Sequence, residues 1–341
     1  MKNIILVSYS FIAALIGAGF ASGQEILCYF AAFGRMGVVG IALTSFLIFI
    51  FIYSVLRVSS AYGLYSIDSF FDISPVPFIK RLIRIMLAVF SFSVYAAMLS
   101  AFGEIMSGFG IPPHAGALTA VALCAILLCL GNNAVFDING LIGMILTAAI
   151  MTCSVYMIRY REYHTFSQLT PVTLNAGIYS GFNLLPALPI LTVMSRRISG
   201  RSEAAAAAFI SATAAGVMLI MIYFLIATYA GKIHLGELPM LTLAARQSRI
   251  FAGVYRAILL TASATTLLSS GGSVLEAVPG GGTPLSVILL SVSGFFLSFI
   301  GFSTLVSSAY RICGMAGIIV VIYIIYLCVK TKNNRVNSRI S

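Results

Sequence analysis

The chain has 341 residues, of which 60% are hydrophobic and only 9% are charged. A soluble globular domain carries about 25% charged residues, so this composition comes close to excluding a soluble enzyme. Abundant apolar residues and low charge also exclude intrinsic disorder. The net charge of +11 indicates contact with anionic lipid headgroups, and no nucleic-acid partner is expected because no basic stripe with interleaved aromatic residues occurs.

Ten stretches of the chain contain at least 18 consecutive residues without Asp, Glu, Lys or Arg. A helix needs about 20 mostly apolar residues to cross a hydrocarbon core ~30 Å thick, so each stretch predicts one membrane span. The stretches are 3–24, 36–56, 85–103, 105–136, 138–158, 163–195, 204–231, 257–275, 277–310 and 312–329. We therefore expect an all-α, polytopic membrane protein with about ten transmembrane helices.

Lys and Arg are distributed unequally between the two ends of these spans. With the N-terminus inside, twelve of them lie on the inner side and eight on the outer side. Positive residues are enriched on the cytoplasmic side, so we expect a multi-pass protein of the cell membrane with both termini in the cytoplasm. Residues 1–329 are expected to form a single transmembrane domain, and residues 330–341 a basic cytoplasmic tail.

The first span is interrupted by small residues. The interruption reads Ile16-Gly17-Ala18-Gly19-Phe20-Ala21-Ser22-Gly23-Gln24-Glu25. Each glycine costs about 1 kcal/mol relative to alanine in a helix, and broken backbone at membrane depth is tolerated only where it faces protein or a wet cavity. Close packing of small residues is an alternative for Gly19 and Gly23, but it does not explain the costly acid at Glu25.

A second interruption falls in the sixth span, where Pro186 and Pro189 each remove a backbone donor. An ordinary proline kink is the alternative interpretation. The interrupted spans are the first and the sixth of ten, which are corresponding positions in two five-helix halves. This arrangement is typical of transporters built from inverted repeats, here about 1–158 and 174–329. We therefore expect helices one and six both to be discontinuous.

The stretch Ile16-Gly17-Ala18-Gly19-Phe20 resembles the broken first helix of the amino acid–polyamine–organocation (APC) superfamily, which has the LeuT-type fold. The longer run from Gly17 to Glu25 is similar to the signature of the YkvI-type membrane permeases within that superfamily. The likeness extends to the ten-span layout and to residues 301–307. Arg311 departs from it, because the resemblance leads us to expect an uncharged residue there.

A half-helix that begins near Ser22 would present unpaired N–H groups of Ser22, Gly23 and Gln24, which suit a carboxylate or another anion. The preceding half would expose carbonyl groups near residues 16–19, which suit a cation. The resemblance implies that the substrate carboxylate binds at this break and that the sixth helix forms the opposite wall. The candidate substrate-binding residues are Gly17, Gly19, Ala21, Ser22, Gly23, Gln24, Tyr179, Ser180, Gly181 and Asn183.

Glu25 has three interpretations: it caps its own half-helix, it carries a coupling proton, or it binds a substrate amine. A charged Glu25 would compete with a substrate carboxylate, which favours the proton-coupling role. In the eighth span, Thr265 and Thr266 resemble the sodium site of sodium-coupled relatives. The alternative is that these hydroxyl groups bond to their own backbone, as is common in membrane helices.

The six cysteines and three histidines show no metal-ligand or disulfide spacing, so we expect no metal and no cofactor other than Na+ or H+ as a coupling ion. The leading hypothesis is a secondary active transporter of a small solute, an amino acid or a related carboxylate, which works by alternating access and is not an enzyme. The alternatives are a ligand sensor on the same scaffold, an intramembrane enzyme and a channel. The sequence specifies neither the solute nor the oligomeric state.

Overall fold

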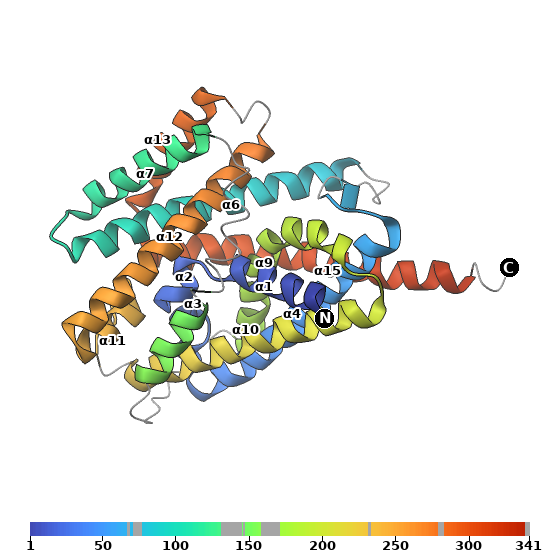
Figure 1. The fold of residues 1–341 in the computed structure, drawn as a ribbon, viewed down its shortest axis with the longest axis horizontal. Helices are drawn as coiled ribbons and strands as arrows, with labels where there is room; N and C mark the ends of the chain where they lie inside the picture. The colour runs from blue at the N-terminus through green and yellow to red at the C-terminus, as the bar shows by residue number, and fades with distance from the viewer. Residues whose placement is uncertain are drawn as a thin grey trace.

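The computed structural model describes residues 1–66, 69–70, 77–130, 145, 147–157, 171–230, 233–278 and 283–337. Helices dominate this part of the chain (Figure 1). They are α1 (Lys2–Leu15), α2 (Ala18–Ser22), α3 (Gln24–Tyr29), η1 (Ala31–Met36), α4 (Gly37–Tyr62), α6 (Pro77–Ser107), α7 (Pro113–Leu130), α9 (Val172–Met194), η2 (Ser195–Arg197), α10 (Arg201–Tyr229), α11 (Pro239–Gln247), α12 (Arg249–Ala277), α13 (Pro284–Ser298), α14 (Phe302–Thr304), η3 (Leu305–Ala309) and α15 (Tyr310–Asn337).

Six helical segments are long and apolar enough to cross a membrane, judged by length and composition among the described residues. They are Ala31–Tyr62, Lys80–Ser107, Val172–Arg197, Arg201–Tyr229, Arg249–Ala277 and Phe302–Lys330. Four shorter apolar helices accompany them: Lys2–Leu15, Pro113–Cys129, Thr147–Met157 and Pro284–Ser298. Much of the predicted span at 138–158 lies outside the described residues.

The helices pack in two groups. In one group α4 packs against α9 and α10, and α1 packs against the same two helices. In the other group α6 packs against α7, α12 and α13, and α7 and α13 lie side by side, as Figure 1 shows at the upper left. The helix α15 contacts both groups, through α9 and α4 on one side and α6 on the other.

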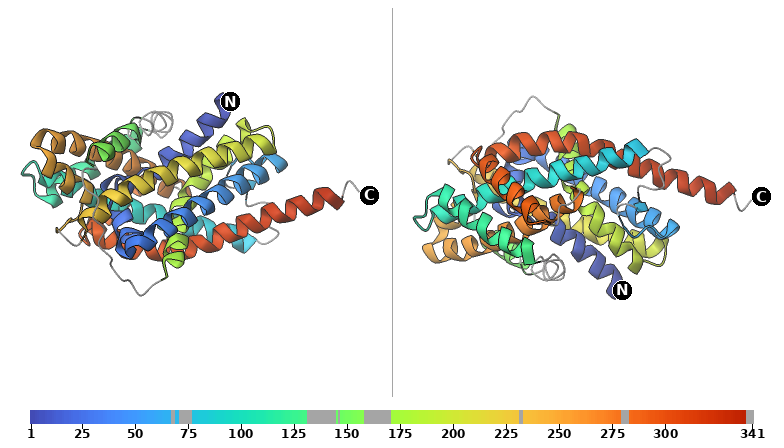
Figure 2. Two further views of the ribbon diagram at one scale, coloured as in Figure 1. Left: turned by 90° about the horizontal axis from the view of Figure 1, so that it is seen from below. Right: turned by 90° about the horizontal axis from the view of Figure 1, so that it is seen from above.

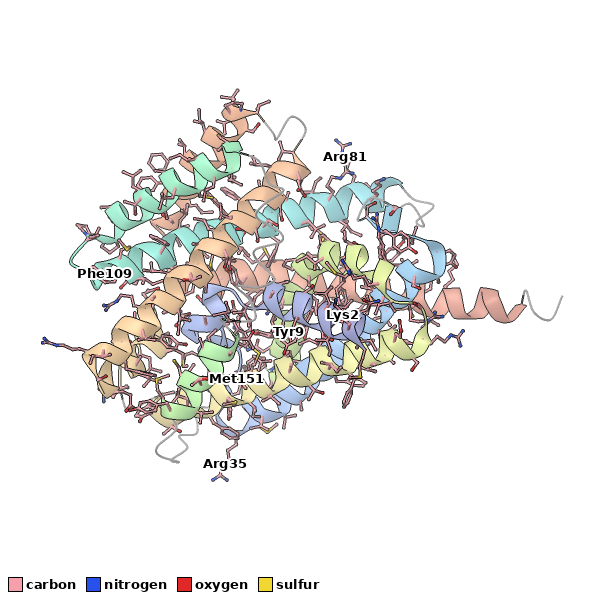
Figure 3. All side chains as sticks on the ribbon, viewed as in Figure 1. Lys2, Tyr9, Arg35, Arg81, Phe109 and Met151 are labelled. Carbon is pink, nitrogen blue, oxygen red and sulfur yellow. The ribbon has the colours of Figure 1, made fainter. Side chains whose placement is uncertain are left out.

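The outer faces of these helices carry large apolar side chains. Phe46, Leu123, Phe209, Leu289 and Ile319 are all more than half exposed, and they come from five different helices. Charged side chains such as Arg35 and Arg81 lie at the periphery (Figure 3). Figure 2 shows the C-terminal end of α15 projecting beyond the other helices. An apolar belt of this kind suits contact with lipid.

The predicted break in the sixth span is wrong. The helix α9 runs without interruption from Val172 to Met194, with Pro186 and Pro189 inside it. Proline removes one backbone donor but does not have to end a helix when packing stabilises both sides. Most side chains of α9 are buried against α4 and α15, so tertiary contacts hold the helix together across both prolines.

Three glycines bring α9 and α15 into close contact. A Cβ atom added at Gly181 would collide with the backbone of Gly314, and one added at Gly317 would collide with the backbone of Gly181. Small residues at such crossings let two membrane helices approach closely. Gly181 therefore lies at a helix–helix contact.

Candidate functional site

The first membrane segment, which consists of α1, α2 and α3, is interrupted twice. The helix α1 ends at Leu15, and Gly17 has extended backbone (φ −102°, ψ −179°) before α2 begins at Ala18. The N–H of Gly17 bonds to the carbonyl of Leu15, so the carbonyl of Ala13 has lost its usual donor four residues on. The predicted interruption of this segment is therefore observed, and its first break lies at residues 16–17.

The second interruption is at Gly23, which has left-handed backbone (φ 78°) between α2 and α3. A Cβ atom here would also collide with the Ile226 and Met240 side chains, so glycine is required for two reasons. The N–H of Gly23 donates to the carbonyl of Phe20, and the N–H of Gln24 donates to Ser22 Oγ at 3.3 Å. The sequence predicts free N–H groups at Ser22, Gly23 and Gln24 for an anion; for Gly23 and Gln24 this is wrong, because the tight local turn uses them.

Glu25 is the buried acid of the site. Only 5% of its surface is exposed, and the side chain folds back over Gly19, where an added Cβ atom would collide with the carboxyl group. The side chains of Tyr179 and Asn183, both from α9, interact with this carboxyl group. Among the described residues, Glu25 Oε2 and the Tyr179 hydroxyl still lack a well-formed hydrogen bond. An acid buried at membrane depth is costly and usually functional, which makes Glu25 a candidate to contact a ligand or an ion.

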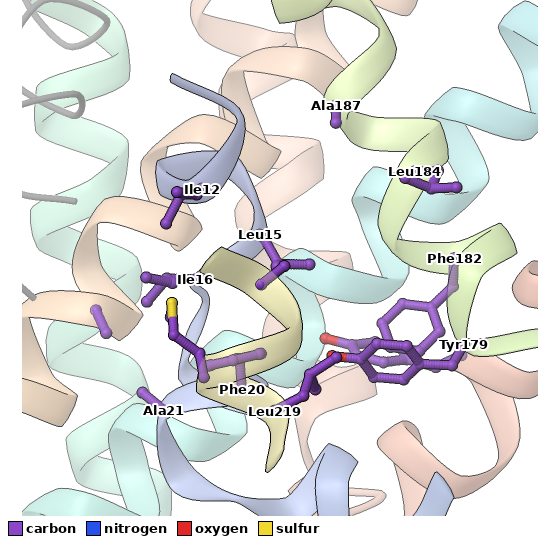
Figure 4. Close-up of a cluster of buried hydrophobic side chains, with 14 of the residues drawn as sticks. Ile12, Leu15, Ile16, Phe20, Ala21, Tyr179, Phe182, Leu184, Ala187 and Leu219 are labelled. Carbon is purple, nitrogen blue, oxygen red and sulfur yellow. The ribbon is translucent and has the colours of Figure 1, made fainter. Parts of the chain in front are cut away.

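Aromatic rings from α3, α9 and α15 cluster around Tyr179, which interacts with the acid. The Tyr179 ring lies 4.8 Å from the Phe30 ring, 5.7 Å from the Tyr29 ring and 5.1 Å from the Phe182 ring. The Phe182 ring in turn lies 5.0 Å from that of Tyr310 on α15. Figure 4 shows Tyr179 and Phe182 across a buried apolar cluster from Leu15 and Ile16 at the first break. The acid therefore lies among apolar and aromatic groups.

Thr266 on α12 approaches the first break from the other helix group. A Cβ atom at Gly17 would lie 3.3 Å from Thr266 Oγ1, so the two residues are direct neighbours. Thr265 differs, because its hydroxyl donates to the carbonyl groups of Thr261 and Ala262 in its own helix. The structure therefore brings Thr266, and not Thr265, to the broken backbone.

The other predicted wall residues lie apart from the acid or are already paired. The Ser180 hydroxyl donates to the carbonyl of Ala176 at 2.7 Å within α9. Gly181 lies against α15.

Tyr179 and Asn183, which do reach the acid, share one face of α9 because they are four residues apart. Asn183 also donates to the carbonyl of Tyr179 at 3.1 Å.

Two sets of polar contacts were not predicted from the sequence. The Tyr255 hydroxyl of α12 donates at 2.6 Å to the carbonyl of Ala21, which lies next to the break at Gly23. In α3, Gln24 Nε2 donates to Ser303 Oγ at 2.6 Å, and Glu237 accepts from the N–H of Ser303. Glu237 precedes α11, so this connection links the loop after α10 to α14 and to the first membrane segment.

Two proteins of Bacillus subtilis (strain 168) are similar to most of the chain. The uncharacterised protein YyaD is 24% identical over 346 aligned positions, which cover 97% of this chain and 98% of YyaD. The uncharacterised membrane protein YkvI is 20% identical over 317 positions, which cover 90% of this chain and 91% of YkvI. No family model matches the chain.

Solved transporters share the fold. A manganese transporter of Eremococcus coleocola superimposes with a TM-score of 0.60 at 13% identity, covering 94% of this chain and 78% of the other. A Na+-coupled sialic acid symporter gives the same TM-score at 11% identity, covering 94% of this chain and 77% of the other. Together with the apolar helices, these similarities define a multi-pass membrane protein with a helical transporter fold.

Proposed function

We propose that the protein is a secondary active transporter that moves a small solute, an amino acid or a related carboxylate, by alternating access. The observation that carries this proposal is the cluster of polar side chains formed by Glu25, Tyr179 and Asn183 beside the first membrane segment, which is broken twice. Unpaired polar atoms buried in a membrane protein are costly and mark solute or ion pathways. The fold shared with solved transporters supports the same conclusion.

The proposed topology has ten spans in two inverted five-helix repeats, with both termini in the cytoplasm. Its support is the pairing of corresponding elements: the first, second, sixth and seventh spans (α1, α4, α9 and α10) form one group. The third, fourth, eighth and ninth (α6, α7, α12 and α13) form the other. Alternating access would then be a rocking of one group against the other around the broken first segment.

Glu25 is the proposed proton-coupling residue. Its carboxyl group is buried, is close to two polar side chains of α9 and lies against the α2 backbone at Gly19. A proton taken up there would neutralise the acid before the solute is released to the other side. Glu25→Gln fixes the neutral state, so it should keep solute exchange while losing accumulation driven by a proton gradient.

Sodium is the second candidate for the coupling ion, and the contact between Thr266 and Gly17 favours it. A hydroxyl oxygen beside carbonyl groups freed by a helix break is a suitable ligand set for Na+. The proposal assigns this role to Thr266 and leaves Thr265 to its own helix.

The test is solute counterflow in proteoliposomes. The purified protein is reconstituted, loaded with an unlabelled amino acid and diluted into a trace of the same labelled amino acid, for each of the twenty standard amino acids. A transporter gives transient accumulation of at least one of them, with saturable rates. A sensor, the alternative function, would show ligand-dependent thermal stabilisation without any counterflow.

A further inference from the structure

Arg311 is a half-buried cation close to the candidate site. It lies at the start of α15, directly after the π-helix η3, and π-helical turns occur frequently at functional sites. Its Nε atom is buried without a partner, and no other described residue forms a hydrogen bond or ion pair with its guanidinium group. A cation kept partly out of water without an ion-pair partner is unfavourable, which suggests that a ligand supplies the partner.

Another half-buried arginine, Arg256, has a partner that stabilises its charge. Arg256 on α12 also has a buried Nε atom without a hydrogen bond. Its guanidinium group lies over the Phe109 ring, 4.9 Å from the centroid, so an aromatic face stabilises the charge. Arg311 has no such aromatic contact among the described residues, which distinguishes it from Arg256.

The position of Arg311 relates it to Glu25. The helix α3, which carries Glu25, packs against η3 just before Arg311, and the Tyr29 hydroxyl of α3 donates to the carbonyl of Val306 in η3 at 3.2 Å. Gln24 is close by, with Nε2 at 3.7 Å from the Cys28 sulfur and Oε1 buried without a partner. The site thus contains an unpaired cationic donor in Arg311 and two unpaired acceptors, Gln24 Oε1 and Glu25 Oε2.

A molecule with a negatively charged and a positively charged group, such as an amino acid, would complement the cationic donor and the two acceptors. We propose that Arg311 binds a carboxylate group of the solute and makes the site selective for solutes that carry a carboxylate. The inference rests on the proposed function, because it assigns the anion-binding residue of the same site. It also replaces the N–H groups at Gly23 and Gln24, which the local turn occupies. A guanidinium group suits this role because its planar donors match a carboxylate in a bidentate geometry.

The first experiment is a thermal-shift titration of the purified full-length protein with defined probes. The probes are the twenty standard L-amino acids, acetate, propionate and lactate, each followed by its carboxamide if it stabilises the protein. We expect at least one carboxylate to stabilise the wild type and its carboxamide to bind about 10- to 100-fold more weakly. If no carboxylate stabilises the protein, or if acid and carboxamide bind equally, the inference is wrong.

The second experiment uses variants. Arg311→Gln should weaken carboxylate binding by about 10- to 100-fold, while Arg311→Lys should keep part of the affinity because it keeps the charge. The matched control is Arg256→Gln, which removes a half-buried arginine that has an aromatic partner and should keep wild-type affinity. Equal affinity of Arg311→Gln and the wild type would overturn the inference.

The two proposals fail differently. If Arg311→Gln transports a carboxylate with unchanged KM, the transport function is supported and the proposed role of Arg311 is refuted. If the wild type binds a carboxylate through Arg311 but shows no counterflow, the role of Arg311 stands and the transport function falls. The carboxamide comparison uses the wild type alone, so it remains decisive if Arg311→Gln does not fold.

Discussion

Gly19→Ala tests the position of the Glu25 carboxyl group. The added methyl group would overlap Glu25 Oε1 and lie 2.9 Å from its carboxyl carbon, where ordinary contact begins at 3.4 Å. The carboxyl carbon must therefore move by about half an ångström and the oxygen farther, which changes the contacts of the carboxyl group with Tyr179 and Asn183. We expect proton-driven uptake to fall about tenfold, since the polar contacts of a buried group contribute about 1–1.5 kcal/mol.

The expected effect on stability is smaller. The obstructing atoms are the end of a flexible side chain, so the overpacking cost lies at the lower end of about 1–3 kcal/mol. Alanine regains about 1 kcal/mol of helix propensity in α2. The two contributions nearly cancel, so the melting temperature should change by less than about 4 °C.

Two controls separate this explanation from a general effect of the methyl group. Gly253→Ala makes the same change in α12, where the added atom meets nothing within 4 Å, and it should leave uptake unchanged. In a Glu25→Ala background the obstruction is gone, so Gly19→Ala should become neutral or stabilising in thermal melts. The reasoning is refuted if Gly19→Ala transports like the wild type or destabilises both backgrounds equally.

Three further changes probe the surroundings of the break. Thr266→Ala should reduce sodium-dependent uptake and Thr265→Ala should not, because only Thr266 contacts Gly17; equal effects in flux assays would contradict this. Tyr255→Phe removes the donor to a buried carbonyl and should destabilise the protein by about 1 kcal/mol, lowering the melting temperature by about 2–4 °C. Glu237→Gln should weaken the link to α14 and speed labelling of Cys28 by an impermeant thiol reagent in a variant without other cysteines; an unchanged rate would show that this link does not shield Cys28.

The interruption of the first segment could be predicted because its cause is local. Gly17 and Gly23 adopt backbone conformations outside the helix, and glycine reaches both at little cost. The start of the next helix could not be placed. The next helix, α2, begins at Ala18 because Gly17 has extended backbone. Ser22 therefore lies at the end of α2 and not at the beginning of a half-helix.

The sixth span shows where local reasoning fails. Pro186 and Pro189 are strong local signals for a break, but burial of α9 against two helices outweighs them. Because α9 is continuous, only residues that share a face can meet Glu25, so Tyr179 and Asn183 reach it while Gly181 faces α15. The role of Glu237 has no local signal at all, since it arises only when the loop before α11 folds onto Ser303.

The most direct test of the central claim is uptake into proteoliposomes under an imposed proton gradient, comparing the wild type with Glu25→Gln for the amino acid that gives counterflow. If the buried acid beside the broken segment couples transport, the wild type accumulates the solute, whereas Glu25→Gln only equilibrates it and keeps counterflow. Accumulation by Glu25→Gln to the wild-type level would contradict the account.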